Sequence, residues 1–330
     1  MTTVLLLHDA VSVNAPPDEL DTLLQVSQIE AALGRLGYIT VRRVFDGDFL
    51  ALENYIQNSS IDVVYNLVET YYGSRFLHLI PLFCEHLGIA VTGGNSESLF
   101  LTSDKLLAKR LMVLAGTPTP PWITRENSGS WPEFLGERVI CKPRGEEASV
   151  GINDDSVMIC DTESSLATVL NHAARHHLLV EKFIDGRECS AAILVSEGVP
   201  EVLPIAEMLF TDFPPDKPKI VGYEAKWNEL SFAYQHTVRS YAIEKSEKAL
   251  IQELRAIALD CWRLFGQSGY TRVDFRIDEA GHVFVLELNL NPCLAQDSGF
   301  VAAGLESGYS YDALIEGIVK EALYERIKLS

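Results

Sequence analysis

Hydrophobic and polar positions follow two alternating periods along the first hundred residues. Short apolar runs, typical of buried strands, are separated by segments whose apolar residues recur every three or four positions, which is typical of amphipathic helices. Strands are predicted at residues 4–7, 40–45, 63–67 and 89–92, and helices from 18 or 21 to 36, at 49–57 and at 76–87. Because strands alternate with helices, we expect a parallel open sheet, and residues 1–98 are predicted to form a Rossmann-like domain. No GxGxxG sequence follows the first strand, so the dinucleotide-binding fingerprint is missing.

The pattern changes after residue 98. Asp104 precedes a helical segment that ends at Gly116, and a proline-rich connector follows at residues 116–122. Strands are then predicted at residues 139–143, 178–183 and 188–195, and helices at 162–176, 249–265 and 311–327. We therefore expect two α+β subdomains, one over residues 99–184 and one over residues 185–330.

The most informative pattern is a predicted hairpin over residues 270–293. Its first strand alternates charged with apolar side chains, the period of a half-buried strand. A register with residue 278 opposite residue 283 brings Asp274 opposite Glu287, and Arg272 opposite Asn289. In its second strand one face is expected to carry four alternate side chains, namely Val283, Val285, Glu287 and Asn289.

Two carboxylates that face each other across a strand pair repel. A hard divalent cation removes that cost, and the oxygen set of Asp274, Glu287 and Asn289 suits Mg²⁺ carrying a nucleotide phosphate. The alternative is that these are solvated polar side chains on the open face of a sheet.

The charge of the chain excludes some classes of partner. The 330 residues include 27 basic and 46 acidic ones, a formal charge of −19, and 47% are hydrophobic, enough for two or three cores. Such a polyanion does not coat nucleic acid or an anionic membrane nonspecifically. A phosphate site must therefore rest on locally placed lysine and arginine and on a bridging metal.

The cysteines indicate a reducing compartment. Six cysteines are scattered singly without a CxxC pair, and no stretch is apolar for 18 residues. We therefore expect a cytoplasmic protein with no membrane partner.

Three lysines are candidates for holding phosphate, since the P-loop sequence GxxxxGK is absent: Lys105, Lys142 and Lys226. Lys142 lies within the apolar run VICKP, and the glycine-containing loop RGEEASVG that follows has backbone N–H groups free to cover phosphates. The alternative is that each is a solvated surface charge. The strand at residues 180–184 could read adenine along an unpaired edge, or it could be an ordinary edge strand.

Hydrolase chemistry has little support in the sequence. His172 and His176 are four residues apart on a predicted helix, which could form half of a zinc site, but no glutamate stands between them as in HExxH. A solvated helix end is the better interpretation, although a zinc hydrolase stays open as an alternative. No GxSxG sequence is present.

Taken in order, several motifs resemble the D-alanine–D-alanine ligase family of ATP-grasp enzymes over nearly the whole chain. The motifs are LGIAVTGGNSESLFLTSDKLLAKRLMVLAGTPTPPW, VICKPRGEEASVG, VEKFIDGRE, GYEAKW, YTRVDFRID and VLELNLNPCLAQDSGF. The resemblance implies an α/β and α+β chain with the ATP-grasp fold, in which a Rossmann-like domain precedes two α+β subdomains that clasp ATP. It further implies an ADP-forming carboxylate–amine ligase that makes an amide bond through an acyl phosphate. ATP, two Mg²⁺ ions (or Mn²⁺), small amino-acid-like substrates and a homodimer are expected.

The resemblance also assigns roles to individual residues. It implies that Asp274, Glu287 and Asn289 bind metal and that Arg272 faces the reacting carboxyl phosphate. Residues implied in ATP binding are Lys105, Lys142, Lys226, Glu181, Lys182, Ile184, Glu188, Leu286 and Asn289. Residues implied near the substrates are Ser149, Lys226, Trp227, Ser298 and Gly299.

Departures from the family pattern cluster on the substrate side. Ala148 replaces the first of two serines, Trp227 replaces a tyrosine, and Cys293 replaces a glycine. Only Asp18 or Glu19 is available to replace the family's N-terminal glutamate, and Glu19 is our prediction for a catalytic contact.

These departures leave the substrate open, so a ligase that joins other amino acids, or an amino acid to a small metabolite, is the main alternative. A nucleotide-binding regulator without turnover is less favoured, because such a protein has no need of Arg272.

Overall fold

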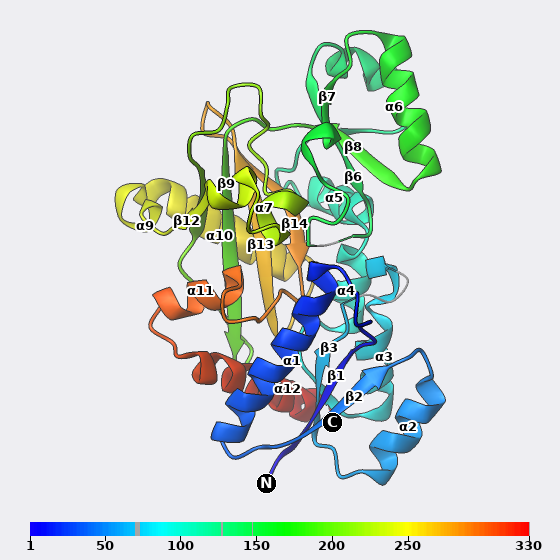
Figure 1. Cartoon of the computed structure of the whole chain (residues 1–330), viewed down its shortest axis with the longest axis vertical. Helices are drawn as coiled ribbons and strands as arrows, with labels where there is room; N and C mark the ends of the chain where they lie inside the picture. Colours follow the sequence, from blue (N-terminus) through cyan, green and yellow to red (C-terminus); the bar gives the residue numbers. More distant parts are fainter. Residues whose placement is uncertain (70–72, 127, 147, 330) are drawn as a thin grey trace.

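The computed structural model describes residues 1–69, 73–126, 128–146 and 148–329, and its strands form three sheets (Figure 1). The strands of each sheet come from one continuous stretch of the chain. Within the described residues, no helix combines the length and the apolar character needed to cross a membrane.

The first sheet is parallel, with strand order β2-β1-β3-β4. Its strands are β1 (Thr3–Asp9), β2 (Ile39–Phe45), β3 (Val63–Leu67) and β4 (Ala90–Val91), and its helices are α1 (Pro17–Arg35), α2 (Phe49–Asn58) and α3 (Leu79–Leu87). The predicted elements are confirmed, except that α3 begins three residues later than predicted because Gly73–Phe76 form a separate 3₁₀ turn. Alternate side chains of β1 and β3 enter two cores, one with α1 and one with α2 and α3.

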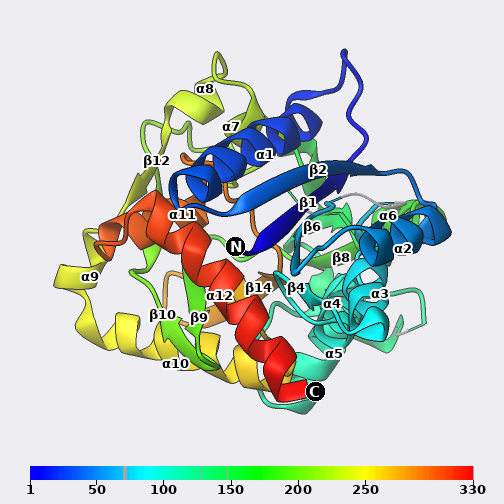
Figure 2. The ribbon, with the colours of Figure 1, turned by 90° about the horizontal axis from the view of Figure 1, so that it is seen from below.

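The C-terminal helix α12 (Tyr311–Leu329) lies beside α1 against the first sheet (Figure 2). Leu314 and Ile318 share one core with Val4 of β1 and with Leu194 of the third sheet. The end of the chain therefore fills the space between the first and third sheets. The division into domains at residues 98 and 184 stays a prediction.

The second sheet is antiparallel, with order β5-β8-β6-β7. Its strands are β5 (Trp122–Ile123), β6 (Arg138–Pro143), β7 (Val157–Ile159) and β8 (Leu178–Lys182), and the nearby helices are α4 (Ser96–Thr102), α5 (Lys105–Leu114) and α6 (Glu163–Arg175). Leu166, Leu170 and Ala173 on one face of α6 pack against β6 and β8. Thr162 caps α6 by accepting a hydrogen bond from the Ser165 amide, as Ser/Thr caps commonly do.

The third sheet has order β12-β11-β9-β13-β14, with β10 paired to β9. Its strands are β9 (Arg187–Ser196), β10 (Val199–Val202), β11 (Ala206–Phe210), β12 (Thr237–Ser240), β13 (Tyr270–Ile277) and β14 (Val283–Asn289), and its helices are α7 (Tyr223–Trp227), α8 (Phe232–Gln235), α9 (Ile243–Ser246), α10 (Lys248–Leu264) and α11 (Gly299–Glu306). The amphipathic helix α10 covers one face through Ile251, Leu254, Ala258 and Cys261. The other face is left for polar side chains.

The β13–β14 ladder confirms the predicted pairing where the polar residues lie. Asp274 is opposite Glu287, and Arg272 is opposite Asn289. Beyond Asp274 the register shifts by one residue, so that Ile277, and not Asp278 as predicted, is opposite Val283. The extra residue is Leu286, which makes a β-bulge.

The bulge also corrects the predicted faces of β14. Val283 and Val285 pack into the core under α10, whereas both Leu286 and Glu287 line the opposite side. The prediction that Val283, Val285 and Glu287 share one face was therefore wrong. Side chains alternate strictly only in an unbroken strand, and the extra residue moves Glu287 to the same face as Asp274.

Gly186 lies in the turn between β8 and β9, where the chain passes very close to the end of β13. Its φ is 142°, and a Cβ built there would lie 2.1 Å from the carbonyl oxygen of Ile277. We expect Gly186→Ala to lower the free energy of unfolding by at least about 2 kcal/mol, measured by urea denaturation. Gly34→Ala, within α1 and with no atom within 4 Å of the added methyl group, should instead raise it by about 0.5–1 kcal/mol. Equal denaturation midpoints for the two variants would contradict this account of the turn.

Candidate active site

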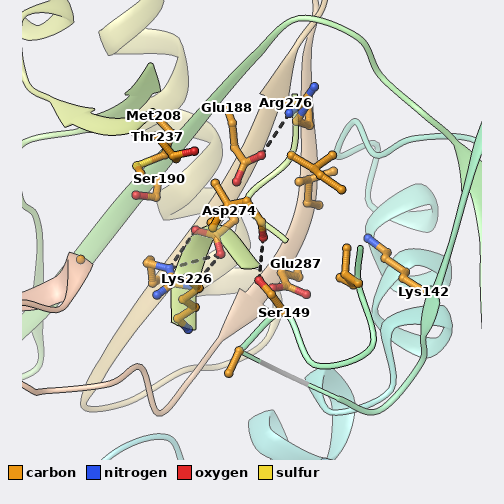
Figure 3. Close-up of a pocket in the computed structure, with 18 of the residues that line it drawn as sticks. Lys142, Ser149, Glu188, Ser190, Met208, Lys226, Thr237, Asp274, Arg276 and Glu287 are labelled. Atoms are coloured by element: carbon orange, nitrogen blue, oxygen red, sulfur yellow. Dashed lines mark hydrogen bonds and ion pairs between the residues drawn. The ribbon is translucent and has the colours of Figure 1, made fainter. Parts of the chain in front are cut away.

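A cavity of about 500 Å³ lies between the second sheet and the free face of the third sheet (Figure 3). β6, β8 and the loop after β6 line one side, and β9, β11, β13 and β14 line the other. The α7 segment, the start of α11 and Asp21 of α1 complete the wall. Polar side chains on the third sheet point into this cavity because α10 occupies the opposite face.

Asp274 and Glu287 both line the cavity, and each has a cationic partner. Arg272 donates from Nε and Nη2 to Asp274, each at 2.8 Å. Lys105 Nζ lies 3.1 Å from Glu287 Oε2 and also donates to the carbonyl oxygen of Glu146. Burial alone would raise the pKa of Glu287, but Lys105 and Lys142 outweigh it and lower the pKa to about 2. Each of the two carboxylates is therefore fixed in position by a cationic side chain, Arg272 for Asp274 and Lys105 for Glu287.

Asn289 takes a different position from the two carboxylates. It lies opposite Arg272 in the ladder, but it is not among the residues that line the cavity. Its Oδ1 accepts a hydrogen bond of 3.1 Å from the Asn291 amide. Its role as a metal ligand stays a prediction.

A buried cluster of two lysines and one glutamate joins α5 to the second sheet. Glu181 is 1% exposed, and its carboxylate lies 2.7 Å from Lys109 Nζ and 2.6 Å from Lys142 Nζ. Burial would raise the pKa of Glu181, but the two ammonium groups hold it below its usual range. Burial also lowers the pKa of Lys109 to about 8. Lys109 was not among the residues predicted from the sequence, although its place one turn after Lys105 on the capped helix was a signal for it.

Lys109 also connects the second sheet to the third. Its Nζ donates to Thr119 Oγ1 at 2.7 Å, and Thr119 Oγ1 donates to the carbonyl oxygen of Val285 at 2.8 Å. The relative position of the two walls therefore depends on a fully buried lysine.

Arg276 is the second functional residue that the sequence analysis did not single out. It is 3% exposed and lines the cavity in the same row of the sheet as Glu188, to which it donates at 3.0 Å (Figure 3). It also donates to the carbonyl oxygens of Ile184, at 2.9 Å, and Lys219, at 2.7 Å. Burial raises the pKa of Glu188, although Arg276 opposes the shift. Arg276 thus positions Glu188 at the start of β9.

The remaining residues expected on the nucleotide side also border the cavity. These are Lys142, Lys182, Ile184, Lys226 and Leu286. Lys182 Nζ pairs with Glu137 at 2.9 Å. Burial lowers the pKa of Lys226, and the nearby Arg272 adds to the effect. Lys226 is therefore a partly buried cation in the cavity wall.

Three hydrogen bonds fasten the loop after β6 to the α7 segment. Trp227 Nε1 donates to the carbonyl oxygen of Ala148 at 3.0 Å, and Ser149 Oγ donates to the carbonyl oxygen of Val221 at 2.7 Å. The Tyr223 amide donates to the carbonyl oxygen of Ile152 at 2.9 Å. Ala148 and Ser149 have φ values of 56° and 63°, a left-handed conformation that is costly for residues other than glycine. The indole therefore reaches a backbone oxygen, so the absence of a side-chain hydroxyl at position 148 does not leave the loop unattached.

The N-terminal acids are placed differently from the prediction. Glu19 is not among the residues that line the cavity, and Asp18 accepts a hydrogen bond of 2.6 Å from the Tyr223 hydroxyl. Asp21, which is nearly one helical turn further along α1, lines the cavity instead. Its Oδ2 accepts from the Cys293 thiol at 3.1 Å, and burial raises the pKa of its carboxyl group. Because residues three apart lie on the same face of a helix, the position of Asp18 could have pointed to Asp21 as an alternative.

The Gln25 side chain links Asp21 to a second buried acid. Its Nε2 donates to Asp21 Oδ2 at 3.1 Å and to Glu69 Oε1 at 2.9 Å, and its Oε1 accepts from the Leu294 amide at 2.9 Å. Burial raises the pKa of Glu69 to about 7, with Gln25 opposing the shift. Asp21 in the cavity wall, and Glu69, to which Gln25 connects it, are thus two acids whose ionisation is disfavoured.

The other residues expected near the substrates lie together. Ser298 and Gly299 line the cavity where α11 begins, and Trp227 lines it from the end of α7. Ser298 Oγ accepts from the Val301 amide at 3.3 Å and caps the helix. The helix N-terminus therefore faces the cavity.

Glu69 predicts a pH dependence of stability. Because its pKa is about 7 in the folded protein and near 4.5 when unfolded, the folded state keeps a proton that the unfolded state releases between these values. The free energy of unfolding should therefore fall from pH 4.5 to 7, by up to about 1 kcal/mol per pH unit. Urea denaturation of Glu69→Gln should show a shallower decrease, and Glu53→Gln on α2 serves as the control. The same slope in wild type and Glu69→Gln would rule out this contribution.

Trp227 predicts a change in the mobility of the loop. Trp227→Phe keeps an aromatic side chain but removes the hydrogen bond of the indole, which is worth about 1 kcal/mol. The amide hydrogens of residues 148–152 should therefore exchange with solvent roughly fivefold faster. Hydrogen exchange read by mass spectrometry measures this, with peptides from β13 as the internal reference. Unchanged exchange at residues 148–152 would show that the indole does not hold the loop.

Comparisons with known proteins agree with this geometry. The model of the D-ala D-ala ligase C-terminus family matches residues 116–320, well over half of the chain. An uncharacterized protein of Sinorhizobium fredii, y4sG, is 34% identical over 263 residues, which cover 79% of this chain and 74% of that protein. The D-alanine–D-alanine ligase of Thermotoga petrophila is 30% identical over 298 residues, 89% of this chain and 90% of the ligase.

Solved structures show the same fold. The D-alanine–D-alanine ligase of Bacillus anthracis in complex with ATP has a TM-score of 0.76 at 19% identity and covers both chains completely. The D-alanine–D-alanine ligase of Coxiella burnetii has a TM-score of 0.73 at 18% identity and covers 99% of this chain and 95% of its own. The expected ATP-grasp fold is therefore confirmed. The chain belongs to the D-Ala–D-Ala ligase family and is an ATP-dependent ligase.

Proposed function

We propose that the protein joins a small amino acid of the D-alanine type, through its carboxylate, to the amine of a second amino acid, and that Mg²⁺ is the metal. The observation that carries the proposal is the Asp274–Glu287 pair, which faces a cavity also lined by Lys142, Lys226 and Arg272. A site for an anionic nucleotide needs this combination of metal-binding oxygens and cations.

The donor set fits magnesium. Asp274 and Glu287 offer carboxylate oxygens from paired strands. Asn289 lies two residues further along β14, and its Oδ1 would have to turn from the Asn291 amide to complete the set. Oxygen donors of this kind suit Mg²⁺, whereas zinc is bound mostly by cysteine and histidine. Mg²⁺ bound here would neutralise charge on the phosphates of ATP.

The first step proposed is attack of the acid's carboxylate oxygen on the γ-phosphorus of ATP, with ADP leaving and an acyl phosphate forming. Arg272, Lys142 and Lys226 neutralise the charge that spreads over the transferring group. Glu181 keeps Lys142 in place from the buried side, at 2.6 Å. Glu188, positioned by Arg276, is proposed to hold the ribose.

The second step proposed is attack of the amine on the acyl carbon, with phosphate leaving and the amine losing a proton. Arg272 is the group that would stabilise the oxyanion of the tetrahedral intermediate. The loop fastened by Trp227 and Ser149 covers the cavity and limits the access of water to the acyl phosphate. Asp21 is proposed, in place of Glu19, to bind the ammonium group of the first amino acid.

The experiment is an assay of ADP and phosphate with Mg-ATP and D-alanine. Asp274→Asn and Glu287→Gln should each lower kcat by roughly a hundredfold or more, because each removes a charge from the phosphate site. Asp278→Asn, at the exposed end of the same hairpin, is the matched control and should retain activity. Activity of Asp274→Asn equal to that of the control, or release of AMP, would refute the proposal.

A further inference from the structure

Arg239 belongs to the cavity because of its place in the third sheet. It lies on the edge strand β12 opposite Met208, and Met208 lies opposite Glu188 of β9. Directly paired residues of antiparallel strands point to the same face. Arg239 therefore shares the face of Glu188 and Arg276, and its side chain lines the cavity.

Arg239 differs from the other two arginines that line the cavity. Arg272 pairs with Asp274 at 2.8 Å, and Arg276 pairs with Glu188 at 3.0 Å. Over the part of the chain that the structure describes, Arg239 has no carboxylate oxygen within 4.0 Å. Its hydrogen bond is from Nη1 to the carbonyl oxygen of Asp297, at 3.3 Å. In a chain with 46 acidic and 27 basic residues, this guanidinium keeps its charge available to a ligand.

The guanidinium lies beside the N-terminus of α11. Arg239 Nη2 is 3.8 Å from the position that a Cβ on Gly299 would occupy, so it adjoins the first turn of this eight-residue helix. The first N–H groups of a helix and its dipole favour anions. The Arg239 guanidinium and the N-terminus of α11 therefore both direct positive charge toward the part of the cavity next to Gly299.

The acidic side chains nearby limit the kind of anion. Asp21 and Asp297 line the same end of the cavity, and Asp297 contributes to the raised pKa of Asp21. Two carboxylates would repel a ligand that carries only negative charge. A ligand with an amino group as well as carboxylates is not repelled in this way, because its amino group lies toward Asp297 while Asp21 binds the ammonium group of the first substrate.

We propose that Arg239 binds a side-chain carboxylate of the amine substrate, so that the second amino acid is acidic. This inference rests on the proposed function, and it adds that Ser298 and Gly299, at the start of α11, bind the α-carboxylate of the second amino acid. Arg239, on β12, supplies a second site of positive charge beside the start of α11. A substrate with one carboxylate would leave this second site unused. The residue thus sets specificity for the amine.

The test compares amines in the presence of Mg-ATP and D-alanine, with ADP release and product mass as readouts. Wild type should use D-glutamate or D-aspartate at least tenfold more efficiently, in kcat/KM, than D-alanine as the amine. Arg239→Ala should lower this ratio at least tenfold, mainly through the KM of the acidic amine, and Arg239→Lys should recover part of it. A wild-type ratio near one, or an unchanged ratio in Arg239→Ala, would overturn the inference.

A control and a binding measurement separate this inference from the proposed function. Arg263→Ala removes an exposed arginine of α10 and should leave the ratio unchanged. If no pair of amino acids releases ADP, the proposed function fails, and calorimetry with a non-hydrolysable ATP analogue still tests Arg239. D-glutamate or D-aspartate should then bind wild type at least tenfold more tightly than Arg239→Ala. Equal binding, or no binding to wild type, would refute the role of Arg239.

Discussion

The site depends on one strand pairing, which places two carboxylates on the same face of the third sheet. Asp274 and Glu287 are opposite each other only because the bulge at Leu286 reverses the alternation of β14. If residues 283–289 ran as a regular strand without the bulge, the core valines of β14 and Glu287 would lie on one face, and either the hydrophobic core or the site would be lost. The sheet thus combines a continuous apolar face under α10 with an acidic face toward the cavity.

Buried charge keeps the two walls of the cavity together. Glu181 is almost completely excluded from water and is stable as an anion because Lys109 and Lys142 each contact one of its oxygens. A buried ion that loses its partner is strongly destabilising, so this cluster tolerates few alternatives. Through Thr119, Lys109 also reaches the backbone of β14, which relates the second sheet directly to the strand that carries Glu287.

The sequence predicted those parts of the molecule that local patterns determine. The alternation in β13 and the pairing of Asp274 with Glu287 were correct, although the predicted pairing at the turn was wrong by one residue, because the bulge at Leu286 offsets that error. The bulge was missed because one additional apolar residue leaves no sign in a hydrophobic run. Lys109 and Arg276 were missed because their partners, Glu181 and Glu188, are distant in the sequence. The hydrogen bond from Trp227 was missed because it ends on the backbone oxygen of Ala148, which the identity of the side chain does not reveal.

The account is tested most directly by following the oxygen of the acid substrate. With D-alanine labelled with ¹⁸O in its carboxylate, transfer through an acyl phosphate predicts one labelled oxygen in each phosphate released, detectable by ³¹P nuclear magnetic resonance. ADP should accompany it in equal amount. Unlabelled phosphate, with the carboxylate oxygen that is lost on amide formation recovered in AMP or in water, would contradict the central claim that this cavity activates a carboxylate by phosphoryl transfer.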